Sequence, residues 1–381
     1  MRFPEFTEEW QGEQLHEIAE LSKAIGISKE QLSENGTPCI LYGELYTKYK
    51  SEIISKIISK TDIEKSKLKH SKQNDVIIPC SGETAIDIAV ARCVPFDNVL
   101  LGGDMNVIRL HKYDGAFMAY QLNGKRKTDI AKLAQGVSVV HLYGENLKSI
   151  KTYNPSLQEQ QKIVKLLSML DERLEVQNKI IEDLKKIKSA IIDKLYSSTN
   201  GEIYSFRQLF EVVNEKNKAR AYKNVLSASQ ELGMIERSDI NIDIKFEQES
   251  ISGYKIVHKG DYVVHLRSFQ GGFAFSDRTG ICSPAYIILR PNDLVVYGYL
   301  SHFFTSKPFI KSLKLVTYGI RDGRSINVDE WLDMPILLPP AQEQIRILTI
   351  VNAIDAKLHN EVKVQFCLSS QKSYLLNTMF I

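Results

Sequence analysis

Residues 155–174 of this chain read PSLQEQQKIVKLLSMLDERL, and residues 339–358 repeat the segment as PPAQEQIRILTIVNAIDAKL. At an offset of 184 positions the copies share Pro, Gln-Glu-Gln, Ile, Asp and Leu, and most other positions exchange residues of one type. This period is too long for a solenoid repeat. The chain therefore contains two copies of a whole module, each ending in this segment.

Each copy begins a long amphipathic helix. Pro155 and Pro339 suit the first helical turn, where Glu159 and Glu343 complement the helix dipole. Apolar residues then recur with alternating spacings of four and three over four heptads, which indicates a coiled-coil seam. The seam positions are 163, 167, 170, 174, 177, 181, 184, 188, 191 and 195, and 347, 351, 354, 358, 361, 365, 368, 372, 375 and 379. Two helices packed separately on their own domains remain the alternative.

The two helices divide the chain into four parts. Residues 1–152 and 199–337 are mixed segments with short β-rich runs such as NVLLGG and AYIILRPND, besides helical stretches. Residues 153–198 and 338–381 are the helical segments. The clearest break is SSTNGE at 197–202, where the first helical segment ends and the second mixed segment begins. We predict an α/β (α+β) fold in which two globular domains alternate with two long helices.

Composition restricts the class of protein. A chain of 381 residues, 43% hydrophobic, can hold two or three domains, and its charge of +3 neither requires nor excludes a polyanionic partner. The chain begins with no apolar leader and has no run of 18 apolar residues. Its five scattered cysteines favour neither disulfides nor zinc. We expect a reduced, cytoplasmic chain without a membrane span.

Residues 155–195 resemble the conserved region of type I restriction–modification specificity subunits: a proline, Glu-Gln, Ile, an apolar stretch, an Asp and a Lys-rich helix. Residues 339–379 follow the same pattern but end in VQFCLSSQKSYLLNTMF, with fewer lysines. The stretches RFPEFTEEW and SGETAIDIAVARCVPFDNVLLGGDMNVIRL are also similar to members of this family, so the resemblance covers the whole chain.

The resemblance implies a function and an architecture. Each mixed segment would be a target-recognition domain that reads one half of a split sequence in double-stranded DNA. The helices would form an antiparallel coiled coil with pseudo-two-fold symmetry, which separates the domains and around which two methylation subunits and motor–nuclease subunits assemble. A coiled-coil protein-interaction scaffold and a stand-alone DNA-binding regulator remain the alternatives.

The sequence offers no catalytic motif. Gly124-Lys125 is followed by Arg126 instead of the Ser or Thr of a phosphate-binding loop. YNPS lacks the second proline and the aromatic residue of an amino-methyltransferase motif, and no Gly-x-Ser-x-Gly or histidine metal pattern occurs. We predict no catalytic residue, metal ligand or cofactor site in this chain. By the resemblance, S-adenosylmethionine, ATP and Mg would belong to the partner subunits.

Candidate DNA contacts follow from the uneven distribution of charge. Residues 45–72 carry eight lysines against three acids, and lysine and arginine contact phosphates or base edges. In the first mixed segment we predict contacts at Tyr42, Tyr46, Lys48, Lys50, Lys125, Arg126 and Lys127. In the second we predict them at Arg267, Gln270, Tyr318, Arg321 and Arg324. The alternative for each is a solvated surface charge, and Asn123-Gly124 would also suit a hairpin turn.

The repeated helices also suggest partner contacts and a register. We predict partner-binding positions at the two Gln-Glu-Gln steps, Gln158, Glu159, Gln160, Gln342, Glu343 and Gln344, with helix capping as the alternative. Pairing the polar seam residues of an antiparallel coil places Lys188 opposite Glu361 and Gln177 opposite Lys372.

Overall fold

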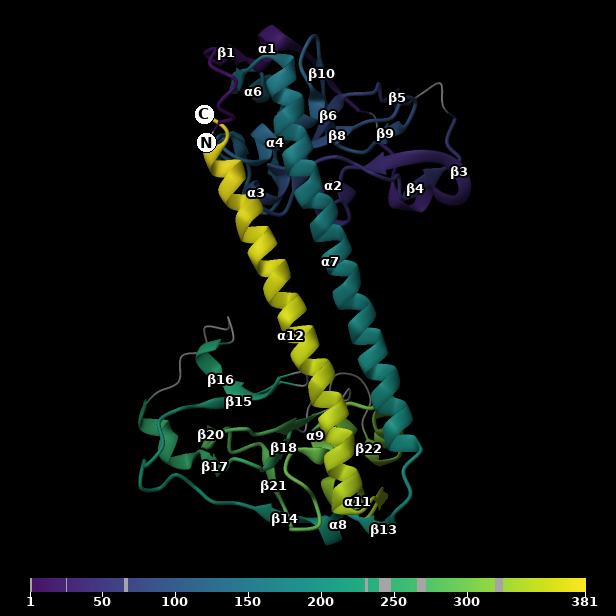
Figure 1. Ribbon diagram of the computed structural model, residues 1–381, viewed down its shortest axis with the longest axis vertical. Coiled ribbons are helices and arrows are strands. Elements are labelled where there is room, and N and C mark those ends of the chain that lie inside the picture. The colour runs from purple at the N-terminus through teal and green to yellow at the C-terminus, as the bar shows by residue number, and fades with distance from the viewer. Residues whose placement is uncertain are drawn as a thin grey trace. The chain divides into compact units, whose positions relative to one another are not determined.

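The computed structural model describes residues 2–24, 26–64, 68–229, 232–239, 248–265, 272–318 and 325–381. The chain forms two compact units: unit 1 is Met1–Lys179 with Lys363–Ile381, and unit 2 is Ile180–Val362. Each unit combines one mixed domain with parts of two long helices, α7 (Leu157–Ser197) and α12 (Ala341–Thr378) (Figure 1). The predicted α+β class with two long helices is confirmed.

The domain of unit 1 is built on two four-stranded sheets. The first has the order β2-β10-β6-β8 and is antiparallel, and the second has the order β4-β3-β9-β5, in which β3 and β9 run parallel. Two short pairs, β1 with β12 and β7 with β11, complete its strands. The strands are β1 (Gln11–Gln14), β2 (Ala19–Lys23), β3 (Leu32–Leu41), β4 (Ser59–Thr61), β5 (Lys69–His70), β6 (Asp75–Pro79), β7 (Ser81–Gly82), β8 (Arg92–Val94), β9 (Leu100–Gly102), β10 (Met105–Leu110), β11 (Val140–His141) and β12 (Lys151–Asn154).

Short helices pack around the two sheets of unit 1. They are α1 (Leu15–Ile18), α2 (Glu44–Thr47), α3 (Ala85–Ile88), α4 (Gly115–Asn123), α5 (Lys127–Lys132) and α6 (Gly144–Leu147). Asp114 caps α4 by accepting a hydrogen bond from the backbone nitrogen of Phe117 at 2.9 Å, as an N-cap aspartate is expected to do. The buried face of α4 then packs against the sheet through Met118 and Leu122.

The domain of unit 2 has a related arrangement. Its antiparallel sheet has the order β14-β21-β18-β19, and its remaining strands pair as β13 with β24, β15 with β16, β17 with β20 and β22 with β23. The strands are β13 (Glu202–Ser205), β14 (Phe210–Val213), β15 (Leu226–Ser229), β16 (Gly233–Glu236), β17 (Lys255–Val257), β18 (Tyr262–Val264), β19 (Phe273–Phe275), β20 (Gly280–Cys282), β21 (Ile287–Pro291), β22 (Thr317–Tyr318), β23 (Ser325–Ile326) and β24 (Pro335–Leu338). The helices are α8 (Phe206–Leu209), α9 (Tyr299–Phe303), α10 (Lys307–Ser312) and α11 (Val328–Leu332).

The two domains repeat one feature that the sequence comparison missed. In unit 1 the guanidinium of Arg109 on β10 forms two hydrogen bonds, of 2.8 and 2.7 Å, with the buried carboxylate of Asp75. In unit 2 Arg290 on β21 binds the buried carboxylate of Asp261 in the same way, at 2.9 and 3.0 Å. The duplication therefore includes the central sheets as well as the helices.

The burial expected of the predicted seam positions is confirmed. All twenty predicted seam positions are buried or half-buried. In unit 1 the side chain of Gln365 donates a hydrogen bond to that of Asn178, and Lys372 pairs with Asp171. The partner number on α12 falls as the number on α7 rises, so the helices run antiparallel there.

The predicted register is wrong. Lys188 pairs with Asp355 at 2.5 Å, where Glu361 was predicted, and Lys372 pairs with Asp171, where Gln177 was predicted. The two observed pairs are equivalent, because both the aspartates and the lysines lie 184 positions apart. The prediction considered only seam positions, whereas each aspartate flanks the seam and its carboxylate reaches the lysine from the side.

The predicted boundaries treat the helices as separate segments, 153–198 and 338–381. The observed helices lie inside these ranges, but each helix is divided between the two units. The reason is packing: in unit 1 a single apolar cluster joins Phe117 and Tyr120 of the domain to Leu167 of α7 and Leu375 of α12.

Candidate nucleic-acid interface

The first predicted contact region is the 42–50 segment, which contains α2 and the residues on either side of it. Lys48 and Lys50 are exposed, and Lys48 forms an ion pair with Glu44 at 2.7 Å. Tyr42 and Tyr46 are half-buried, and burial is the main cause that raises the pKa of the Tyr46 hydroxyl. The four predicted residues thus share one short segment, and the lysines are its most exposed members.

The second predicted region is the turn between α4 and α5. Lys125 is exposed and Lys127 is half-buried. The side chain of Arg126 is only 16% exposed, and its contact with DNA stays a prediction. Its guanidinium lies over the Tyr153 ring at 5.6 Å and donates a hydrogen bond to the backbone oxygen of Ile381 at 2.8 Å. Arg126 thus links Ile381, which follows α12, to the domain.

In unit 2 most predicted contacts fall outside the described residues. These are Arg267, Gln270, Arg321 and Arg324. Tyr318 is described on β22, where it is 55% exposed. Its hydroxyl donates a hydrogen bond of 2.6 Å to the carboxylate of Glu330, which raises the pKa of the hydroxyl.

The last residue of each Gln-Glu-Gln step, Gln160 or Gln344, binds the backbone of its own domain. The side-chain oxygen of Gln160 accepts a hydrogen bond from the backbone nitrogen of Asp114 at 3.0 Å, and its amide donates to Pro155 at 2.8 Å. Gln344 repeats this arrangement with Val296 and Pro339, at 2.8 and 2.9 Å. Both glutamines are buried, so each joins the start of its helix to its own domain.

The two glutamates of these steps differ. Glu159 is 1% exposed and receives two hydrogen bonds of 2.7 Å from Arg2, with the indole nitrogen of Trp10 at 3.4 Å. Glu343 is more exposed and binds Arg346, whose hydrogen bonds lower the pKa of the Glu343 carboxyl. Partner contact at these steps stays a prediction for all six residues, of which Gln158, Gln342 and Glu343 are the more exposed.

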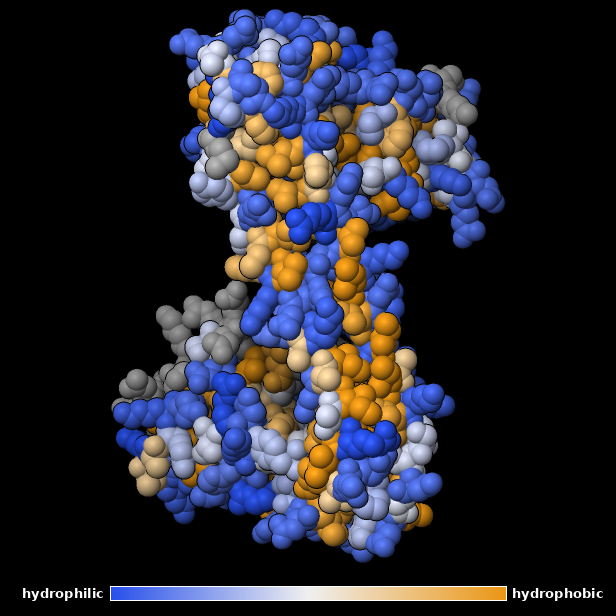
Figure 2. All heavy atoms as spheres, viewed as in Figure 1, coloured by the Kyte–Doolittle hydropathy of each residue, from blue (hydrophilic) through white to orange (hydrophobic). Residues whose placement is uncertain are grey.

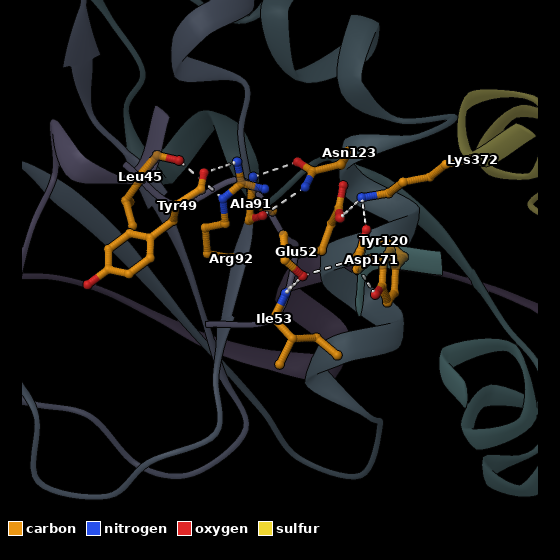
Figure 3. Close-up of polar contacts among 11 residues, drawn as sticks. Leu45, Tyr49, Glu52, Ile53, Ala91, Arg92, Tyr120, Asn123, Asp171 and Lys372 are labelled. Carbon is orange, nitrogen blue, oxygen red and sulfur yellow. Dashed lines mark hydrogen bonds and ion pairs between the residues drawn. The ribbon is translucent and has the colours of Figure 1, made fainter. Parts of the chain in front are cut away.

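A buried polar cluster joins the domain of unit 1 to both helices (Figure 3). The ammonium of Lys372 on α12 lies between the carboxylates of Glu52 and Asp171, and their side chains are 7% and 8% exposed. The hydroxyl of Tyr120 on α4 donates to Asp171 at 2.7 Å, and the hydroxyl of Ser51 donates to the same oxygen at 2.9 Å. Burial and the nearby Asp171 raise the pKa of Tyr120.

Unit 2 contains a smaller counterpart of this cluster. Lys188 pairs with Asp355, and the ring of His302 on α9 lies 4.0 Å from that carboxylate and 3.4 Å from Asn352. Burial lowers the pKa of His302. The sequence analysis did not identify either cluster, although the matching Asp and Lys positions of the two copies were a usable signal.

The reactive groups of unit 1 include two buried thiols, Cys39 and Cys80. Burial raises the thiol pKa of Cys39 to about 11 and that of Cys80 to about 12, so these thiols stay protonated. No group of three His, Cys, Asp or Glu side chains suited to a metal ion occurs among the described residues. No described helix is both long enough and apolar enough to cross a membrane.

Comparison with known proteins gives consistent matches. Residues 7–186 match the family model of the type I restriction modification DNA specificity domain. The chain is 24% identical, over 312 residues, to the protein assigned as the MjaX type I restriction enzyme specificity subunit of Methanocaldococcus jannaschii, covering 72% of this chain and 70% of the relative.

Two solved structures share the fold along almost the whole chain. The S subunit of a type I restriction–modification system from M. genitalium matches with a TM-score of 0.59 and 16% identity, covering 100% of this chain and 97% of the other. A chain from a structure concerned with complex assembly and conformational transition of the type I R-M system matches with a TM-score of 0.61 and 14% identity, covering 98% and 97%.

Proposed function

The chain belongs to the specificity subunits of type I restriction–modification systems, and we propose that each of its two mixed domains reads one half of a two-part DNA site. It is a DNA-recognition subunit, and the family is one of recognition subunits rather than enzymes. The observation that carries the proposal is the duplication: the repeated module comprises the sheet, its Arg–Asp pair and the long helix. A two-part site requires two readers, and one duplicated module supplies them.

The candidate DNA contacts support this function through their charge. Lys48 and Lys50 are exposed in the 42–50 segment, and Lys125 is exposed beside α5. Lysines of this kind neutralise phosphates and release counterions, which supplies affinity without sequence preference. Tyr42 and Tyr46 are half-buried in the same segment as Lys48, and base contacts are proposed for their rings. We propose that this surface of unit 1 faces the duplex.

The long helices are proposed as the docking site for two methylation subunits, with motor–nuclease subunits joining the assembly. Figure 2 shows apolar side chains that remain on the surface along the helices, and Met169 and Val176 of α7 are 54% and 59% exposed. Exposed apolar surface of this kind is typical of interfaces. In this proposal the partners hold S-adenosylmethionine, ATP and Mg, and the assembly is cytoplasmic.

The test is an exchange of domains. The chain is co-expressed with its methylation subunit, and methylated adenines are mapped by long-read sequencing. Replacing residues 1–152 by the first domain of another family member is expected to change one half of the methylated motif and leave the other half as it was. A motif in which both halves change, or the absence of any two-part motif despite confirmed assembly, contradicts the proposal. A protein-interaction scaffold would show no sequence-specific, salt-sensitive DNA binding.

A further inference from the structure

The buried cluster of unit 1 restricts the position of the loop that follows α2. Lys372, Glu52 and Asp171 are 13%, 7% and 8% exposed at their side chains. Charges that are removed from water must stay paired, because an unpaired buried charge is strongly unfavourable. Glu52 therefore cannot move away from α12 and α7 without losing the ammonium that compensates it.

The backbone around Glu52 is held on its other side by β8. The nitrogen of Cys93 donates to the carbonyl of Glu52 at 2.8 Å, and the nitrogen of Ile54 donates to the carbonyl of Cys93 at 3.0 Å. Ser51 adds its hydrogen bond to Asp171. The loop thus has fixed contacts to a strand of the domain and to a helix of the coiled coil.

The same strand holds the candidate DNA-contacting segment. Arg92, next to Cys93 on β8, is 7% exposed and donates hydrogen bonds to the carbonyls of Leu45 at 3.1 Å and Tyr49 at 2.9 Å (Figure 3). These carbonyls belong to the 42–50 segment, whose exposed lysines face solvent. Strand β8 therefore binds both the 42–50 segment, through Arg92, and the Glu52 loop that follows it, through Cys93.

We propose that Lys372 is a positioning residue for DNA recognition by unit 1. By holding Glu52 and Asp171, it fixes the orientation of the 42–50 segment, although it comes from the last helix of the chain. This inference rests on the proposed function. It implies that recognition of the half-site read by residues 1–152 depends on a side chain from α12.

The experiment compares Lys372→Met with Lys372→Arg in the complex of the full chain with its methylation subunits. Binding competition uses duplexes that carry single-base changes in one half-site or the other. A contact to a correct base contributes discrimination of about 5- to 150-fold. Lys372→Met is expected to reduce discrimination about tenfold in the half-site read by residues 1–152, and to change it less than about twofold in the other. Lys372→Arg is expected to retain the discrimination.

Two further variants serve as a control and as a substitute for Lys372→Met. Lys188→Met removes the equivalent lysine in unit 2, and should leave discrimination in the first half-site unchanged. Ser51→Ala removes the hydroxyl that donates to the Asp171 carboxylate and accepts from the backbone nitrogen of Ile53. It leaves the ion pairs of Lys372 in place and serves if Lys372→Met does not fold; it should weaken discrimination in the same half-site only. A folded Lys372→Met or Ser51→Ala complex that keeps its discrimination, or loses it equally in both halves, overturns the inference. A wild-type complex without any two-part motif would instead contradict the proposed function.

Discussion

Replacing Lys372 with Met is expected to destabilise unit 1 strongly. The change would leave the carboxylates of Glu52 and Asp171 buried together without the ammonium that is paired with both, while the charge of Arg92 still attracts them. Removing one partner of a buried ion pair costs about 3–5 kcal/mol, because the remaining charge stays desolvated. Two like charges remain here, so we expect unit 1 to lose at least about 3 kcal/mol of its free energy of unfolding. Met has a similar length, so a cavity contributes little to this loss.

Lys188→Met is the matched control, because it removes the equivalent ion pair of unit 2. The side chains of Lys188 and Asp355 are 25% and 35% exposed, so water screens both charges. The loss in unit 2 should stay below about 1 kcal/mol, as for exposed pairs. Adding Glu52→Gln to Lys372→Met should restore part of the stability of unit 1, since one of its two unpaired charges is then absent.

Backbone hydrogen exchange, followed by mass spectrometry over a urea series, measures the opening free energy of each unit separately. This resolution is needed because a chain with two units does not have to unfold in one transition. A loss below about 1 kcal/mol in unit 1 of the Lys372→Met protein would refute the reasoning. Equal losses for Lys372→Met and Lys188→Met would also refute it.

Three further outcomes are expected. Tyr120→Phe removes the hydroxyl that donates to Asp171 and should cost unit 1 about 1–3 kcal/mol in urea unfolding; no change would mean that water replaces the donor. Burial lowers the pKa of His302 below its usual 6.5, so on acidification the unfolded chain takes up the proton before the folded chain does. The contribution of His302 to the free energy of unfolding of unit 2 should therefore be fully present above pH 6.5 and fall as the pH drops towards 5. In thermal unfolding, the melting temperature of unit 2 should depend less on pH in His302→Gln than in the wild type. An equally steep pH dependence would contradict the role given to His302. Cysteines at Asn178 and Gln365 should crosslink under mild oxidation, because these side chains touch, and poor crosslinking would contradict the observed register.

The helices and their seam were predictable because their signal is local. An amphipathic helix repeats its buried positions every three or four residues, and this pattern is visible without knowing the partner. Every predicted seam position is buried or half-buried. The register was not predictable from the same pattern, since Asp171 and Asp355 lie outside the seam and their reach depends on how the helices pack.

The exposure of the candidate DNA-contacting residues was predictable only in part. Exposed Lys48, Lys50 and Lys125 agree with a basic surface, because isolated lysines in a polar stretch usually face water. Arg126, in equally polar surroundings, is instead used for packing on Tyr153 and for binding the end of α12. Nothing in its neighbouring residues distinguishes it from Lys125.

The amino-acid sequence by itself determined the duplication, the two long helices and the seam, because each of these depends on residue types at short or constant spacing. Only the tertiary structure decided which charges are paired. Lys372 meets Glu52 across 320 residues of chain, and Arg2 meets Glu159 across 157. Such pairs carry no periodic signal, and they form because folding places these charges in a low-dielectric interior where each needs a partner.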